Sequence, residues 1–212
     1  MSLSPNGKDT APNAKGTDAW RRVAEAGHSG DETTARESIT DDDPVLRELS
    51  LGALARMGAL TEHDLLNAFS DGDYSVRRRA AIIAAQRRDV SLAALLHDQH
   101  DSVVEAAAWA CGEHEVVGEE EFAKLLALAA DAAEPLVREA AIAALGAIGD
   151  QRGLPAVLAG CSDKPAIRRR AVLALAPFSG PKVDAALQVA LQDRDWQVRQ
   201  AAEDLSPRLR VD

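Results

Sequence analysis

The clearest amphipathic pattern in the chain lies at residues 134–149, where apolar residues recur at the spacing of one helix face. They are Val137, Ala141, Ala144, Leu145 and Ile148, at i, i+4, i+7, i+8 and i+11, which is a helical and not a strand period. Pro135 suits a first helical turn, and Gly149 suits a left-handed helix end. The pattern predicts an amphipathic helix of about four turns, which is too short to be stable alone in water and must pack on neighbours.

Variants of this stretch recur along the chain. We expect similar helices at 43–58, 73–88, 101–112, 164–177 and 195–207, and shorter apolar helices between them at 61–69, 91–97, 118–130, 153–161 and 181–192. The arginine of the pattern stands at 47, 77, 138, 168 and 199, so the steps are 30, then 61 for two units, then 30 and 31. A period of this length made of paired helices predicts an α-solenoid.

Five of the six longer helices open with Asp or a similar residue and an aliphatic-Arg pair, and Ala-Ala and Leu-Gly follow in the best examples, such as Leu145 and Gly149. This pattern resembles the short HEAT repeat, a kind also found in HEAT-like proteins related to phycobilin lyases, over residues 31–208. The resemblance implies an all-α fold, an α-α superhelix that forms a right-handed α-solenoid of about six helix pairs. It also implies that the repeated arginines bond the Asp of their own or a neighbouring unit, and that the longer helices line the concave side.

The expected domain organisation is simple. Residues 1–17 are rich in Ser, Pro, Asn, Gly and Lys, a composition typical of a disordered tail. Residues 18–212 form a single solenoid, in which the short helical segments within 18–40 act as a cap, because the end unit of a solenoid must hide an apolar face that has no neighbour.

The third unit departs from the repeat because it lacks the arginine. If Asp101 opens its helix, Glu105 occupies the arginine position; if Cys111-Gly112 is aligned with Leu145-Gly146, Val104 does. The second alignment places Trp109 in one column with Gly52, Ile82, Ala143 and Leu173, whereas the first turns it partly into the core. Both alignments predict that a ladder of Asp-to-Arg pairs is interrupted in the middle of the chain.

Composition narrows the range of partners. The net charge is −10 and the pI is near 5.0, which argues against nucleic acid, since such binding depends on neutralised phosphates. No run reaches the ~18 apolar residues expected of a membrane span. Cys111 and Cys161 lie in apolar helical surroundings, and we expect free thiols in a reducing cytoplasm.

The candidate binding residues lie on the longer helices. Subtracting the repeat arginine from two Arg triplets leaves Arg78, Arg79, Arg169 and Arg170, which could bind carboxylates or phosphates or simply form a solvated face paired with glutamates. Trp109 on an apolar stripe between Arg and Glu has the composition of a protein-binding hot spot. The full candidate set is Arg78, Arg79, Ile82, Glu105, Trp109, Glu139, Arg169, Arg170 and Leu173.

These features predict a non-catalytic scaffold or adaptor that docks a segment of another protein along the concave face, without cofactor, metal or catalytic residues. The alternative is an enzyme of related fold: an alkylpurine DNA glycosylase, a bilin lyase, or a metal-dependent hydroxylase that holds iron with repeated His-Glu pairs. The chain has one such pair, His114-Glu115, with His97 and His100 elsewhere. The motifs of zinc proteases, phosphate loops and nucleophile elbows are missing from the sequence.

Overall fold

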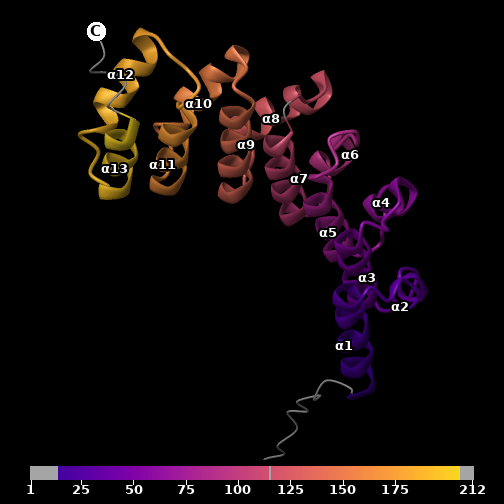
Figure 1. The fold of residues 1–212 in the computed structure, drawn as a ribbon. Helices are drawn as coiled ribbons and strands as arrows, with labels where there is room; N and C mark the ends of the chain where they lie inside the picture. The colour runs from indigo at the N-terminus through magenta and orange to yellow at the C-terminus, as the bar shows by residue number, and fades with distance from the viewer. Residues whose placement is uncertain (1–13, 115, 206–212) are drawn as a thin grey trace, which may run out of the picture. The chain divides into compact units, whose positions relative to one another are not determined.

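The computed structural model describes residues 14–114 and 116–205, and all regular elements in these ranges are helical (Figure 1). Residues 1–13 of the expected tail and 206–208 of the last expected repeat lie outside the described residues. The chain divides into two compact units, Met1–Leu65 and Leu66–Asp212, with the boundary inside helix α4 (Glu62–Phe69).

The described part of the first unit contains α1 (Ala14–Ser29), α2 (Glu32–Ser38), α3 (Pro44–Met57) and the start of α4. Helix α1 packs against α3 so closely that a Cβ added at Gly27 would lie 2.8 Å from the Cα of Ala53. The indole Nε1 of Trp20 donates to the Asp43 carboxylate over 2.7 Å, at the N-cap of α3. Residues 14–17, which were expected to belong to the tail, are therefore part of a packed helix.

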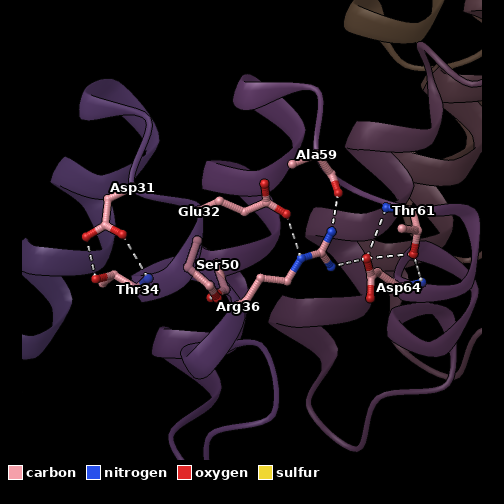
Figure 2. Close-up of polar contacts among 9 residues, drawn as sticks. Asp31, Glu32, Thr34, Arg36, Ser50, Ala59, Thr61 and Asp64 are labelled. Atoms are coloured by element: carbon pink, nitrogen blue, oxygen red, sulfur yellow. Dashed lines mark hydrogen bonds and ion pairs between the residues drawn. The ribbon is translucent and has the colours of Figure 1, made fainter.

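Polar contacts fix the loop before α4 to α2 (Figure 2). The Arg36 guanidinium donates to Glu32, to the Asp64 carboxylate and to the carbonyl of Ala59. The buried Ser50 hydroxyl of α3 donates to the carbonyl of Ala35 in α2. One arginine thus joins a helix, a loop and the next helix within this unit.

The second unit contains a row of long helices, with a second set of helices packed beside them (Figure 1). The row consists of α5 (Tyr74–Ala84), α7 (Asp101–Glu113), α9 (Pro135–Ile148), α11 (Pro165–Ala174) and α13 (Trp196–Leu205). The helices beside the row are α6 (Ala93–Leu96), α8 (Glu119–Asp131), α10 (Leu154–Gly160) and α12 (Pro181–Ala190). Helix α5 ends at Ala84, and not near Arg88 as predicted; α6 is also shorter than the expected segment at 91–97.

Small residues let the long helices approach one another. In α9, the predicted core residues Val137, Ala141, Ala144 and Leu145 are buried. A Cβ added at Gly146 would lie 2.7 Å from the Cα of Ala174 in α11. Real Cβ atoms do not come this close to a backbone atom, so the contact between α9 and α11 depends on glycine.

Side-chain caps set the register of the long helices. Asp73 and Asp195 accept hydrogen bonds from backbone N–H groups two residues later, at 2.8 and 2.9 Å, as is typical of N-caps. In α7 the cap is His100, whose Nδ1 accepts from Ser102 N at 3.3 Å and whose ring stacks on Tyr74 with centroids 3.9 Å apart. The alignment that began this helix with Asp101 as the capping residue is wrong. Val104 therefore occupies the arginine position.

The repeated arginines of the second unit form rungs between successive loops. The ion pairs are Arg77 with Asp98 at 2.6 Å, Arg138 with Asp163 at 2.9 Å, and Arg168 with Asp193 at 2.8 Å. Each arginine also donates to a carbonyl of the loop before its own helix, at Asp71, Ala132 and Asp163 respectively. The structural role predicted for these arginines is confirmed. Hydrogen bonding to arginine lowers the pKa of all three paired carboxyl groups.

The rung that would start from α7 lacks both its arginine and its aspartate. Val104 stands in the arginine position and is only 5% exposed. Ala132 stands two residues before the N-cap Glu134, as Asp98 stands two residues before His100. No buried side-chain nitrogen or oxygen lacks a partner in the described ranges. The predicted interruption is confirmed, and the paired replacement leaves no buried charge behind.

Candidate functional site

An open groove of about 520 Å³ runs over the second unit's long helices. It is lined by Arg78 and Ile82 of α5; Ser102, Glu105, Ala106 and Trp109 of α7; Leu136, Glu139, Ala140 and Ala143 of α9; and Arg170 of α11. The common register explains this gathering. Ile82, Trp109 and Ala143 are each the ninth residue after the N-cap of their helices.

Trp109 is the largest apolar side chain of the groove, and it is 44% exposed. Around it the lining consists of the small residues Ala106, Ala140 and Ala143, together with Leu136, which is 54% exposed. Small neighbours leave the indole uncovered and leave space beside it. The groove can therefore receive an apolar side chain against the Trp109 ring.

The charged groups of the groove differ in how far they are already engaged. The Glu139 carboxylate accepts from Arg170 Nε at 3.2 Å. Within residues 14–114 and 116–205, the side chains of Arg78 and Glu105 make no hydrogen bond or ion pair that would have to be broken on binding. These two groups are the ones most available to a charged ligand.

The structure brings together six of the nine candidate residues. Arg78, Ile82, Glu105, Trp109, Glu139 and Arg170 line the groove, whereas Arg79, Arg169 and Leu173 do not. Sequence reasoning missed Ser102 and Leu136, which are both the second residue after an N-cap, and Ala106 and Ala140, which are both the sixth. Their shared positions could have been found once the register of α7 was known.

A second cavity of about 320 Å³ lies between α7, the start of α8 and the loop before α6, and it was not among the predictions from the sequence. His114 Nε2 is 3.0 Å from the carbonyl of Ala84, and the Ser91 hydroxyl donates to the buried Glu121 carboxylate. Burial raises the pKa of the Cys111 thiol to about 12, so the group stays protonated and is a poor nucleophile. These contacts tie loops to helices.

The residues weighed for the iron-dependent alternative do not gather in the described part of the chain. His114 contacts a backbone carbonyl, the His100 ring caps α7, and Glu115 lies outside the described residues. Among residues 14–114 and 116–205, no group of three or more His, Cys, Asp or Glu side chains is placed to hold a metal ion. In the same ranges, no helix is both long and apolar enough for a transmembrane span.

Comparison with known proteins agrees with the repeat register. The family model for HEAT repeats matches residues 62–146 and 122–206, which together span more than half of the chain. The chain therefore belongs to the HEAT-repeat family. No curated protein sequence matches it.

Two solved structures have a similar fold. A designed armadillo repeat protein in complex with a (KR)4 peptide is 18% identical, with a TM-score of 0.60 over 83% of this chain and 98% of that one. The Escherichia coli protein YibA is also 18% identical, with a TM-score of 0.59 over 92% of this chain and 75% of that one. At such identities the likeness concerns the fold alone. The predicted all-α solenoid class is confirmed.

Proposed function

We propose that this protein is a non-catalytic binding scaffold or adaptor, and that its groove receives a segment of a partner protein. The observation that carries the proposal is the half-exposed Trp109 in a groove floored by alanines. Tryptophan is enriched among the residues that dominate binding energy at protein interfaces. Uncovered apolar surface of this kind is unfavourable in water and is typical of interaction sites.

The fold supports the proposal in a general way. Stacked helix pairs form long continuous surfaces that suit extended ligands. The designed armadillo repeat protein, which shares the fold, was solved with a peptide bound. By analogy, a groove across four successive helices could hold a peptide segment of this chain's partner.

The role of the arginines is narrower than the sequence suggested. Arg78, Arg79, Arg169 and Arg170 were expected to select acidic groups together. Only Arg78 and Arg170 line the groove, and Arg170 is already paired with Glu139. The apolar anchor at Trp109 is therefore the main element of the proposed interface, and Arg78 is the most available cation in its lining.

Selection of phage-displayed random peptides on the immobilised protein tests the proposal. Peptides selected on the wild type should lose at least about tenfold in affinity for Trp109→Ala, because truncation removes a central aromatic anchor. The matched control is Trp196→Ala, which removes a tryptophan that is 64% exposed and lies outside the groove. Peptides that bind the Trp109→Ala variant as tightly as the wild type would contradict the proposal.

A further inference from the structure

The charged residues of the long helices follow a regular column. The fifth residue after the N-cap is Arg78 in α5, Glu105 in α7, Glu139 in α9 and Arg169 in α11. Along the row the charges are therefore positive, negative, negative and positive. The first three line the groove, and Arg169 continues the column on the next helix.

The members of this column can still accept a ligand. Arg78 and Arg169 are exposed, and neither side chain has an ion pair or hydrogen bond within the described ranges. Glu139 keeps 23% of its side chain exposed beside Arg170. Glu105 precedes Trp109 by four residues on α7, so the carboxylate and the indole lie on the same helix face.

The centre of the groove favours a cation. Two carboxylates occupy the middle of the column: in the part of the chain that the structure describes, Glu105 has no ion pair, and Glu139 accepts from Arg170 through Oε1 only. The face of an aromatic ring also attracts a positive charge. The same two carboxylates would repel a phosphate backbone or a uniformly acidic peptide. The cationic groups at the two outer positions favour acidic side chains instead.

We propose that the groove, together with Arg169 on the exposed face of α11, binds an extended segment with basic residues at its centre and an acidic residue near each end; this inference rests on the function proposed above. Packed helices lie about 8–10 Å apart, and an extended chain rises about 3.3 Å per residue. Every third residue of an extended bound segment therefore lies over the next helix of the row. The expected pattern is acidic, basic, basic, acidic, with two residues between each pair of charges and an apolar residue over Trp109.

The charge pattern of the column is symmetric, so the same rule applies to either direction of the bound segment. A partner would be recognised by this order of charges and not by its net charge, because the charges of the two acidic and the two basic residues cancel. The occupant is thus a nearly neutral peptide segment, distinct from nucleic acid and from polycationic chains.

Two fluorescein-labelled synthetic peptides test the inference against the full chain by fluorescence anisotropy at low salt. One carries the acidic, basic, basic, acidic pattern; the other has every charge inverted and the same apolar residues. The first should bind about tenfold more tightly, as several partly exposed charge pairs each contribute modestly. Equal affinities, tighter binding of the inverted peptide, or no binding of either would overturn the inference.

Charge reversal in the protein sharpens the test. Glu105→Arg should lower the preference for the first peptide by about fivefold or more. Glu203→Arg is the matched control, because Glu203 is an exposed glutamate on α13 outside the groove. Glu105→Gln gives a weaker change of the same sign if the reversed variant does not fold. An unchanged preference in both Glu105 variants would also overturn the inference.

The two proposals fail in different ways. If the charge-patterned peptides do not discriminate while Trp109→Ala still abolishes binding of the display-selected peptides, only the charge rule is wrong. If the display-selected peptides ignore Trp109, the groove itself is not the binding site.

Discussion

The repeats that contain α7 and α9 lie side by side and share one register, yet only α9 carries the arginine of an arginine–aspartate ion pair. In the α9 repeat, Arg138 joins its own loop to Asp163 of the next loop. In the α7 repeat, Val104 is buried at the same position and Ala132 replaces the partner aspartate. The two repeats also differ on the groove face, where α7 presents the large side chain of Trp109 and α9 presents the small side chain of Ala143.

This comparison separates the features that position the helices of a repeat from the features that vary between repeats. The helix start, the aliphatic residue three positions later and the small residues of the core are common to both repeats. The arginine of a repeat is not required for the register of its helix, since α7 keeps the common register with Val104 in that position. Caps and apolar packing therefore position the helices, and the rungs add local stability to the loops.

Rebuilding the missing rung should have the largest effect. Val104→Arg alone should destabilise the protein by about 3–5 kcal/mol, because it buries an unpaired charge. Adding Ala132→Asp should recover about 2 kcal/mol, since the new pair occupies the positions used elsewhere in the unit. Urea denaturation of the wild type, both single variants and the double variant measures this coupling. Additive single effects would show that the α7 position cannot hold a rung.

The glycines of α7 and α9 offer a second comparison. Gly146→Ala should cost about 2 kcal/mol, because the new Cβ would lie 2.7 Å from the Cα of Ala174 and force the helices apart. Gly112→Ala is the matched change in α7, where the nearest atom is the Cα of Ala144 at 3.1 Å. A helix-propensity gain of about 1 kcal/mol should offset most of its strain. Thermal unfolding that ranks the two variants in the opposite order would contradict this packing analysis.

The rungs should also make stability depend on pH, by the smallest of the three effects. The bond to Arg77 holds the pKa of Asp98 below its ordinary value of 3.8. Its contribution, about 1 kcal/mol, is therefore present above the unfolded-state pKa and is lost as the pH falls through the lower folded-state value. Asp98→Asn should be less stable than the wild type at pH 7, and the difference should shrink below about pH 4.

The matched control for this titration is Asp131→Asn, at an exposed aspartate of α8 that takes part in no rung. Its stability difference from the wild type should stay small and nearly constant with pH. A gap between wild type and Asp98→Asn that is equally large at pH 3 and pH 7 would show that the charge of Asp98 does not act through the rung.

Much of the fold could be predicted because the repeat depends on residues that are close together in the sequence. The period of the arginines, the helix of α9 and its buried face follow from spacing alone. The register of α7 could not be fixed, because the neighbouring Asp101 is a common capping residue whereas His100 is not. The histidine is held there by its stack on Tyr74, a contact between helices that local spacing does not contain.

The groove could be predicted only in part for the same reason. The column of Ile82, Trp109 and Ala143 was visible as one of two alignments, and the structure supplied the choice between them. Leu136 and Ser102 face the groove because of how α7 and α9 pack, and the hydrogen bond from Ser91 to the buried Glu121 joins residues 30 positions apart. Such contacts depend on three-dimensional placement more than on any motif.

The missing rung at α7 has a consequence for how charged molecules from solution could disturb the ion pairs of the protein. An incoming carboxylate or guanidinium can exchange partners with a neighbouring ion pair, and such exchange would loosen the loop that the pair secures. Between α7 and the loop before α9 there is no rung to exchange with, because Val104 and Ala132 carry no charge. The contact between α7 and α9 is therefore apolar at this point, and salts that weaken the ion pairs of the other rungs have no ion pair to weaken between Val104 and Ala132.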